Sequence, residues 1–251
     1  MTLGERLKPF AAPPHLRVDA LGRCPLFRSL RPEVLWDLAP GTTLYQTRRR
    51  QPIFREDDDT NRCWLLVSGL AKIAQSTACG RVIIHRLVVP GELLGGLSAG
   101  PGSPALATSA VALEASLVLT IEQPFIDQAL LRHPGLGRNA VRLLLQRLRQ
   151  MEDDHVRLAT GKVEERLAEL LVRLAEKVGR PGPEGVQLGL TREDLAQMVG
   201  TNHFSVSRQL AQWESQGFLL SRREVVVVVD GPGLLEAARP QVVVETTRRA
   251  G

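Results

Sequence analysis

Short apolar runs separated by turn-forming residues fill the first half of the chain. They occupy residues 44–45, 52–54, 63–67, 70–73, 82–89 and 111–121. Ser68-Gly69, Cys79-Gly80 and Pro90-Gly91 stand between them. Runs of this length, broken by glycine and proline, are typical of strands joined by tight turns. The pattern therefore predicts a compact antiparallel β domain that extends from Thr42 to Ile121.

After Pro134-Gly135 the apolar positions recur every three or four residues, which is the period of a helix. One face of residues 136–158 carries Ala140, Leu144, Leu148, Met151 and the pair His155/Val156. A leucine-rich stripe and outward arginines accompany this face, namely Leu143, Leu144, Leu145 and Leu148 with Arg142, Arg147 and Arg149. Such a helix commonly packs against a second copy of itself as a coiled coil. The same period also allows a helix that lies on its own β domain.

A second helix is predicted over residues 163–178. Its apolar face holds Leu167, Leu170, Leu171 and Leu174, and Gly179 provides the stop. Residues 180–185 are predicted to form a loop. Further on, the five consecutive valines at residues 225–229 indicate a buried strand.

Residues 191–216 carry the capping signals of two short helices joined by a glycine turn. Thr191-Arg192-Glu193-Asp194 has the pattern of a capping box, and Gly200 ends that first helix within two turns. Asn202 is a good N-cap for the second helix, residues 203–216. The buried positions are expected to be Leu195, Met198 and Val199 in the first helix, and Val206, Leu210 and Trp213 in the second. The pair forms a helix-turn-helix, a motif whose second helix lies in the DNA major groove.

Candidate DNA-contacting residues lie at the turn, on the outward face of the second helix and at a hairpin tip. Arg208 suits paired hydrogen bonds to guanine, and Ser205 or Ser207 can bind bases or phosphates. Residues 218–220 and 225–229 predict a β-hairpin wing with Arg222 and Arg223 at its tip as phosphate ligands. The full set is Thr201, Asn202, His203, Phe204, Ser205, Ser207, Arg208, Arg222 and Arg223.

Composition narrows the class of protein. The 251 residues are 43% hydrophobic and 24% charged, which argues against disordered and fibrous chains. Aromatic residues make up only 4%, which argues against stacking platforms for single strands and favours duplex DNA. The net charge of +5 fits a polyanionic partner, yet residues 161–251 hold 12 basic and 12 acidic side chains. That neutrality leaves open a signalling module whose C-terminal helices bind protein.

Neither catalysis nor export is indicated. No nucleophile, base and orienting group stand together, and no phosphate loop or metal-ligand motif occurs, so we do not expect an enzyme. Three cysteines without a CxxC pair suit a reducing cytoplasm. The uncharged residues 93–113 have about the length of a membrane span, but clustered glycines and prolines interrupt them. We therefore predict loop and strand there, and no membrane partner.

Residues 200–210, with the sequence GTNHFSVSRQL, and residues 213–219, WESQGFL, resemble the helix-turn-helix signature of the Crp/Fnr superfamily, named after the cyclic-AMP receptor protein and the fumarate-nitrate regulator. Upstream segments at residues 26–30, 52–56, 67–69, 90–95 and 163–167 follow in family order, so the likeness covers residues 21–230. It implies an α+β fold with an N-terminal antiparallel β-roll of the cyclic-nucleotide-binding kind. The implied parts are this effector-sensing domain at residues 21–134, a dimerisation helix at 135–160, a winged helix-turn-helix at 161–237 and a tail at 238–251.

The resemblance implies a cytoplasmic bacterial transcription regulator. It would bind a pseudo-palindromic duplex as a homodimer, with RNA polymerase as a further partner. The family usually has Glu where this chain has Phe204, and Phe cannot accept a hydrogen bond from cytosine. Phe204 could touch a thymine methyl group or simply pack. The preferred half-site is therefore expected to differ, with His203 contributing.

The effector site departs further from the family pattern. Cyclic-nucleotide binders place a ribose-binding Glu at Gly96, an Arg-Ser pair for the phosphate at Leu106 and Ala107, and a hydroxyl pair at Met151 and Glu152. Without that Arg, the phosphate loses a charge-assisted contact, so we do not expect cyclic AMP. A different anion remains open, and the candidate effector residues are His85, Arg86, Gly95, Gly96, Leu106, Ala107, Arg147, Met151 and Glu152.

A redox or gas sensor of the same family is the alternative. Its iron-sulfur members use four cysteines, whereas this chain has Cys24 alone in the first region and Leu119 at the fourth position. Cys24, Cys63 and Cys79 are too few for an all-cysteine cluster in one subunit. His85 or His133 could complete a mixed iron-sulfur or haem site. Regulation without any ligand also remains open.

Overall fold

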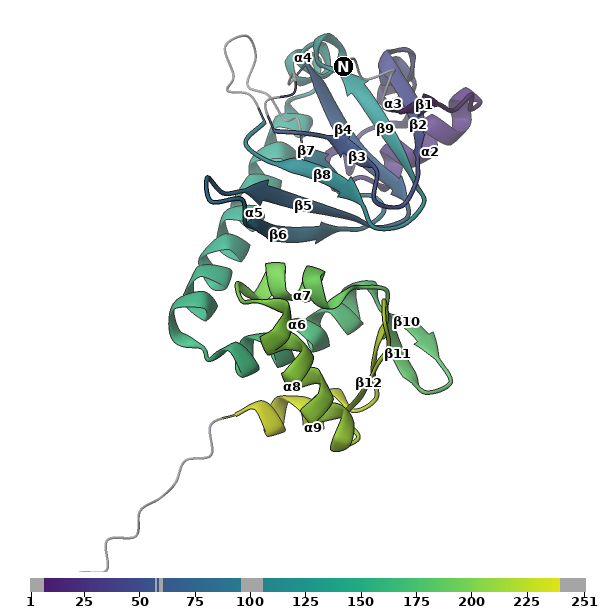
Figure 1. Ribbon diagram of the computed structural model, residues 1–251. Coiled ribbons are helices and arrows are strands. Elements are labelled where there is room, and N and C mark those ends of the chain that lie inside the picture. The colour runs from purple at the N-terminus through teal and green to yellow at the C-terminus, as the bar shows by residue number, and fades with distance from the viewer. Residues whose placement is uncertain (1–6, 57, 59–60, 96–105, 240–251) are drawn as a thin grey trace, which may run out of the picture. The chain divides into compact units, whose positions relative to one another are not determined.

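The computed structural model describes residues 7–56, 58, 61–95 and 106–239 (Figure 1). The chain divides into two compact units, Met1–His155 and Val156–Gly251, and the division falls inside the long helix α5 (Pro134–Thr160). Among the described residues, no helix combines the length and hydropathy needed to cross a membrane.

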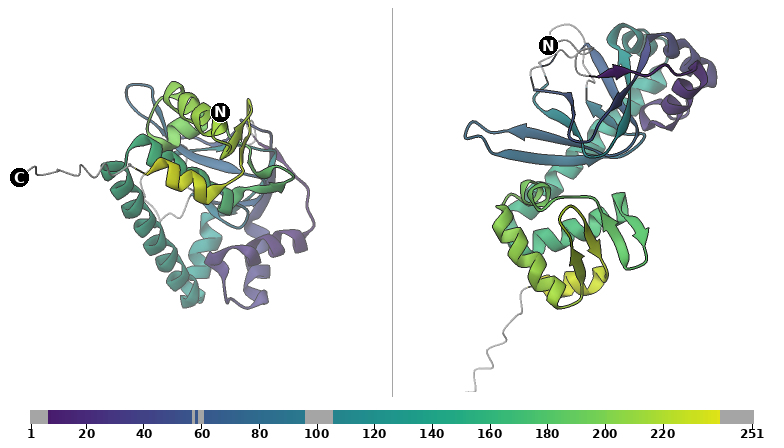
Figure 2. Two further views of the ribbon diagram at one scale, coloured as in Figure 1. Left: turned by 90° about the horizontal axis from the view of Figure 1, so that it is seen from below. Right: turned by 45° about the vertical axis from the view of Figure 1, so that its right-hand side comes forward.

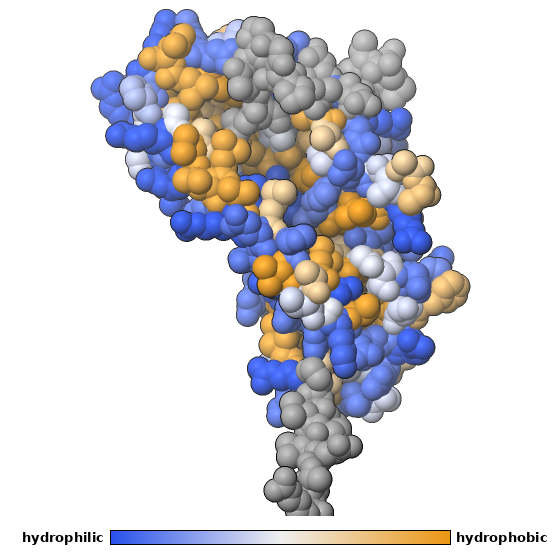
Figure 3. Space-filling model, turned by 90° about the vertical axis from the view of Figure 1, so that its left-hand side faces the viewer, coloured by the Kyte–Doolittle hydropathy of each residue, from blue (hydrophilic) through white to orange (hydrophobic). Residues whose placement is uncertain are grey.

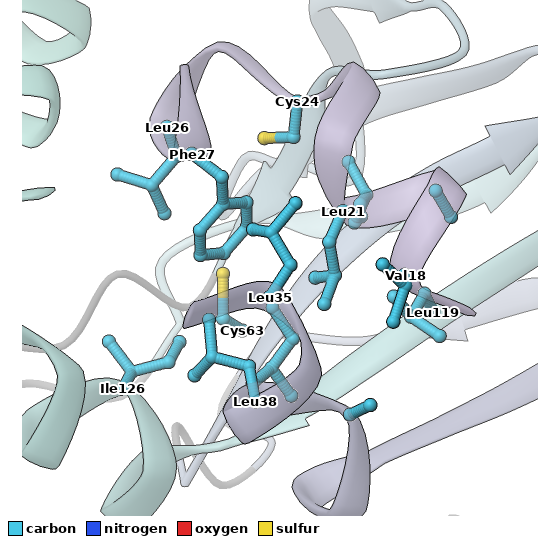
Figure 4. Packing of buried hydrophobic residues seen from close by; sticks show 14 of the residues in the cluster. Val18, Leu21, Cys24, Leu26, Phe27, Leu35, Leu38, Cys63, Leu119 and Ile126 are labelled. Carbon is cyan, nitrogen blue, oxygen red and sulfur yellow. The ribbon is translucent and has the colours of Figure 1, made fainter. Parts of the chain in front are cut away.

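The first unit begins with a short strand and a group of small helices. They are β1 (Lys8–Pro9), α2 (Pro14–Arg23), η1 (Pro25–Phe27), α3 (Pro32–Leu38) and η2 (Ala39–Gly41). Proline occupies the first turn of each helix, where its fixed φ favours the helix and its missing N–H costs nothing. Apolar side chains of α2, η1 and α3 pack together with strand residues in one buried cluster, as Figure 4 shows for Leu21, Phe27 and Leu35.

Two antiparallel sheets follow and confirm the predicted β domain (Figure 1). The strands are β2 (Thr42–Thr47), β3 (Pro52–Phe54), β4 (Arg62–Ser68), β5 (Ala71–Ser76), β6 (Val82–Val88), β7 (Leu93–Gly95), β8 (Ser109–Ala112) and β9 (Ser116–Glu122). One sheet has the order β1-β2-β9-β4-β7 and the other β3-β8-β5-β6. A second buried cluster, which includes Phe54, Trp64 and Ile73, draws residues from both sheets.

The expectation of one apolar run at residues 111–121 is wrong. The run divides into β8 and β9, which belong to different sheets. The chain turns between them beside Gly69, where Leu113 N donates to Leu70 O at 2.8 Å and Ser116 Oγ donates to Glu114 O at 2.9 Å. Gly69 has a φ of +89°, and a Cβ there would overlap the Ser116 side chain. The apolar pattern is continuous because both strands are buried, so the pattern alone does not show the turn.

Two helices close the first unit. Helix α4 (Gln123–Arg132) buries Ile126 and Ala129 and was not predicted from the sequence. Helix α5 begins at Pro134, two residues before the predicted start, and buries Leu136 and Asn139. The Asn139 amide donates to Leu26 O at 3.0 Å and to Arg28 O at 2.8 Å, which fixes the first turns of α5 to η1. The first turns of this helix therefore lie on their own domain, as one of the two sequence interpretations expected. Its later apolar side chains are exposed, and packing against a second copy stays a prediction.

The second unit combines helices with a small antiparallel sheet (Figure 2). Its elements are α6 (Val163–Val178), β10 (Arg180–Gly182), β11 (Gly185–Leu188), α7 (Arg192–Val199), α8 (His203–Ser215), β12 (Leu219–Ser221), β13 (Val226–Val228) and α9 (Gly231–Ala238). The bounds of α6 and its buried leucines are as predicted. The predicted loop at residues 180–185 is wrong, because β10 and β11 pair there as an antiparallel hairpin. The hairpin extends the sheet of the wing to the order β10-β11-β13-β12.

Candidate DNA-binding and effector sites

Helix α7 starts with the predicted capping box. Asp194 N donates to Thr191 Oγ1 at 3.1 Å, and Thr191 N donates to Asp194 Oδ2 at 3.2 Å. These two bonds satisfy backbone groups that the helix leaves unpaired at its N-terminus. Gly200 ends the helix with a φ of +76°, a left-handed conformation that suits glycine. Leu195 and Val199 are buried as predicted, whereas Met198 is only half-buried.

Helix α8 presents its N-terminal half outward. Asn202 is its N-cap and accepts a hydrogen bond from Ser205 N at 2.9 Å. Val206, Leu210 and Trp213 are buried, as predicted, and hold the helix against the rest of the unit. The opposite face is therefore fixed in orientation by a cap at one end and a buried tryptophan at the other.

The predicted DNA readers lie together on that outward face. His203, Phe204 and Arg208 are exposed, and Ser205 and Ser207 are half-buried. Within the described residues the Arg208 guanidinium has no hydrogen bond or ion pair, so its donors are available to a base edge. At the turn before α8, Thr201 is half-buried and Asn202 exposed.

The wing carries Arg222 and Arg223 at the predicted tip, where Arg222 N donates to Val225 O at 2.8 Å. Sequence reasoning missed the partner of Arg222. Its guanidinium donates to Glu184 Oε2 at 2.5 Å, and Glu184 lies in the turn between β10 and β11. Arg223 is exposed and makes no such pair within the part of the chain described. Of the two phosphate candidates, Arg223 is therefore the one that needs no rearrangement to bind.

Two further contacts tie the wing to the helix-turn-helix. Ser221 N donates to Glu214 Oε1 at 2.8 Å, and Arg192 Nη2 donates to Ser221 Oγ at 3.1 Å. Strand β12 is thereby joined to α8 through Glu214 and to α7 through Arg192. No spacing rule signals these pairs, because their members are seven and 29 residues apart and meet only in the folded unit.

The candidate effector residues centre on Arg86 of β6. Its guanidinium donates to Leu93 O at 2.5 Å and to Leu94 O at 3.4 Å, and it lies 3.6 Å from Glu92 Oε2. Burial, with the positive charge of Arg147, lowers the pKa of Arg86 to about 10, and Glu92 partly opposes this. The Arg86 side chain thus stabilises strand β7 through its carbonyl groups. The carboxylate of Glu92 balances only part of the Arg86 charge.

Arg147 of α5 belongs to the same cluster. Burial lowers its pKa, and the carboxylates of Asp154 and Glu92 act against that change. His85 is exposed and its Nε2 lies 3.1 Å from Gln75 Oε1. Burial and the charge of Arg147 lower the pKa of His85. We call His85, Arg86, Glu92, Arg147 and Asp154 the effector cluster.

No side-chain hydrogen bond or ion pair joins the other candidate effector residues to this cluster among the described residues. Gly95 is the half-buried last residue of β7, and Gly96 lies outside the described residues. Leu106 packs against the second buried cluster, so an apolar contact occupies the position of the family's phosphate-binding Arg. Ala107 is exposed. Met151 and Glu152 are exposed on α5.

Comparisons with known proteins bear on both units. Residues 165–237 match a model described as the Crp-like helix-turn-helix domain, and residues 46–133 match the cyclic nucleotide-binding domain. A protein of Mycobacterium tuberculosis named CRP-like cAMP-activated global transcriptional regulator is 24% identical over 223 residues, which cover 88% of this chain and 99% of the relative. The chain belongs to the Crp/Fnr family of transcription regulators. It is therefore a regulator of transcription with a DNA-binding helix-turn-helix, and not an enzyme.

A second relative and a solved structure are also similar to this chain. The fumarate and nitrate reduction regulatory protein of Escherichia coli is 25% identical over 194 residues, which cover 76% of each chain. The solved structure of FixK2 from Bradyrhizobium japonicum has a TM-score of 0.68 at 23% identity, over 78% of this chain and 96% of that chain. At that identity the likeness establishes the fold alone, and it confirms the α+β class.

The three cysteines of this Crp/Fnr member do not form one ligand set. Cys24 and Cys63 are buried in the apolar cluster of the first unit (Figure 4), whereas Cys79 is exposed in the turn after β5. Burial raises the pKa of Cys24 to about 11 and also raises the pKa of Cys63, so both stay protonated thiols at neutral pH. The Thr77 hydroxyl lowers the pKa of Cys79. Over the described ranges, no three His, Cys, Asp or Glu side chains group to hold a metal, so these residues do not fit an iron-sulfur cluster.

Proposed function

We propose that this regulator binds a specific DNA duplex as a homodimer, with α8 in the major groove. The observation that carries the proposal is the capped α7–α8 pair, whose outward face leaves the Arg208 guanidinium exposed and without a partner among the described residues. Ser207 and Arg208 act as the principal base readers, and His203 and Phe204 modulate specificity. Thr201, Asn202 and Ser205 at the start of α8, with Arg222 and Arg223 on the wing, contact the phosphates around them.

Helix α5 supports the dimer. Its exposed residues Val141, Leu144, Leu148, Met151 and His155 are spaced three, four, three and four apart, which is a heptad seam. The four aliphatic members are 52–58% exposed in the single chain. Figure 3 shows hydrophobic patches on the side of the molecule where α5 lies in Figure 1. Exposed apolar side chains gathered on one helix face mark an interface, and their heptad spacing suits a symmetric copy of the same helix.

The first unit is proposed to sense an anionic effector other than cyclic AMP. Burial, followed by the positive charge of Arg147, lowers the pKa of Arg86, and burial lowers the pKa of Arg147. A bound anion would favour the charged form of both arginines. Leu106 and Ala107 supply no charge to a cyclic phosphate. Titration calorimetry with cyclic AMP is expected to show no saturable heat. Saturable binding of cyclic AMP would contradict this part of the proposal.

The ion pair on the wing gives a prediction about DNA affinity. Glu184→Gln is expected to raise the affinity for any duplex by about two- to fivefold, because an exposed ion pair worth up to about 1 kcal/mol no longer holds Arg222 away from phosphate. Fluorescence anisotropy with a labelled random duplex measures the change. Glu236→Gln, which removes the same charge from an exposed position of α9, is the matched control and should leave affinity within error. An equal gain for both variants would show a general charge effect instead.

Duplex binding at low salt tests the proposal against a protein-binding module. Nonspecific affinity for DNA is strongest there, because fewer counterions compete for the phosphates. The full-length protein is expected to bind a random 30-base-pair duplex, with an affinity that falls as salt rises. Absence of binding to any duplex under these conditions would favour the module whose C-terminal helices bind protein. RNA polymerase as a partner and the cytoplasm as the location stay predictions.

A further inference from the structure

Phe204 is unusual among the apolar side chains of the second unit. It is 73% exposed, more than any other large hydrophobic side chain described in residues 156–239, and it is the second residue of α8. Val206, Leu210 and Trp213 are the apolar side chains that α8 buries in the core of the unit, and the phenyl ring of Phe204 lies outside that core. An exposed ring at the start of a recognition helix is therefore free to contact a ligand.

The phenyl ring of Phe204 contacts the imidazole of His203. Its centroid lies 3.9 Å from that of the His203 imidazole, with 35° between the planes. His203 Nδ1 in turn lies 3.8 Å from Glu193 Oε2, and Glu193 accepts a hydrogen bond from Gln197 at 3.0 Å. A chain of contacts from α7 thus limits the positions of an otherwise mobile side chain. A pre-positioned apolar group loses little entropy on binding.

The chemistry of a phenyl ring decides what it can recognise in the major groove. It has no hydrogen-bond donor or acceptor, so it cannot read the polar edges of guanine, adenine or cytosine. The apolar group that B-DNA displays there is the C5-methyl group of thymine, and 5-methylcytosine carries the same group. Arg208 lies four residues after Phe204 on the same helix face, so a guanine contact and a methyl contact fall close together in one half-site.

We infer that Phe204 reads the C5-methyl group of a pyrimidine next to the base pair that Arg208 contacts. The inference rests on the proposed function, because it requires α8 to lie in the major groove. It assigns His203 and Glu193 as positioning residues that hold the ring. The methyl group is that of thymine, and the experiment also asks whether 5-methylcytosine is read in the same way.

The test replaces each thymine of the selected binding site in turn with deoxyuridine, which removes only the methyl group. At one position per half-site, affinity is expected to fall by about fourfold, and by about 15-fold when both half-sites are changed, as for burial of one methyl group each. Phe204→Ala should remove this sensitivity while the site is still bound. Because the side chain is exposed, the variant is expected to fold. Arg223→Ala is the control and should keep the full sensitivity to deoxyuridine.

A second arm places a C·G pair at that position, with and without a C5-methyl group on the cytosine. A gain of about fourfold on methylation shows that methylated DNA is read as well, and no gain restricts the source to thymine. Equal deoxyuridine effects in wild type and Phe204→Ala, or no effect at any thymine, would overturn the inference and leave DNA binding intact. Failure to bind any duplex would overturn the proposed function itself.

Discussion

Arg208→Ala is expected to lower the affinity for the specific site by about 5- to 150-fold, the equivalent of about 1–3 kcal/mol. The exposed guanidinium can donate two hydrogen bonds to the O6 and N7 atoms of one guanine, and alanine leaves those atoms without partners. The variant should also accept other bases at one position in each half-site. Anisotropy titrations against a set of single-base variants of the site measure both effects.

Arg223→Ala provides the comparison, because Arg223 is a phosphate ligand in this account. Its loss should weaken binding to specific and random DNA alike, and it should reduce the dependence of log affinity on log salt by about 1. If Arg208→Ala also lost affinity equally for specific and random DNA, its assignment as a base reader would be wrong.

Leu148→Glu is expected to dissociate the dimer. Leu148 lies in the middle of the heptad seam of α5 and is 52% exposed in the single chain. A dimer buries the exposed half of both copies, each worth about 0.8–1.5 kcal/mol, and the variant also places two like charges in the seam. The dimer dissociation constant should therefore rise by at least about 100-fold. Sedimentation equilibrium measures it, and DNA affinity should fall with it because the two half-sites are no longer bound together.

Gln146→Glu is the matched control for this variant. It adds the same charge to an exposed position of α5, two residues from Leu148 and so on a different face of the helix. It should remain a dimer. A far-ultraviolet circular dichroism spectrum unchanged in both variants would show that the chain stays folded. A Leu148→Glu protein that sediments as the wild type does would exclude the α5 seam as the interface.

Elements governed by local rules could be predicted closely from the sequence. The capping box Thr191–Asp194, the Asn202 cap and the Gly200 stop act over a few residues, and each is present in the structure. Helix α6 matches its predicted bounds because its leucine period and the glycine that follows it are both local signals. The same local signals placed the candidate readers on α8, and their role in DNA binding stays a prediction.

Features that depend on distant pairing could not be predicted. The apolar run at residues 111–121 divides because its halves join different sheets, and β10 forms because β11 pairs with it and with β13. The pair between Arg222 and Glu184 joins side chains 38 residues apart. Likewise Arg86 was predicted as an effector ligand, but its hydrogen bonds to the carbonyls of β7 depend on the fold of the sheet.

Selection of binding sites from a random duplex library tests the central claim most directly. A homodimer that places two α8 helices in successive major grooves should enrich a two-fold symmetric motif, with half-sites centred about 34 Å or one helical turn apart. Each half-site should contain a guanine that the wild type requires. The Arg208→Ala variant should bind with equal affinity when another base replaces it. An enriched pool without a two-fold symmetric motif would contradict the account.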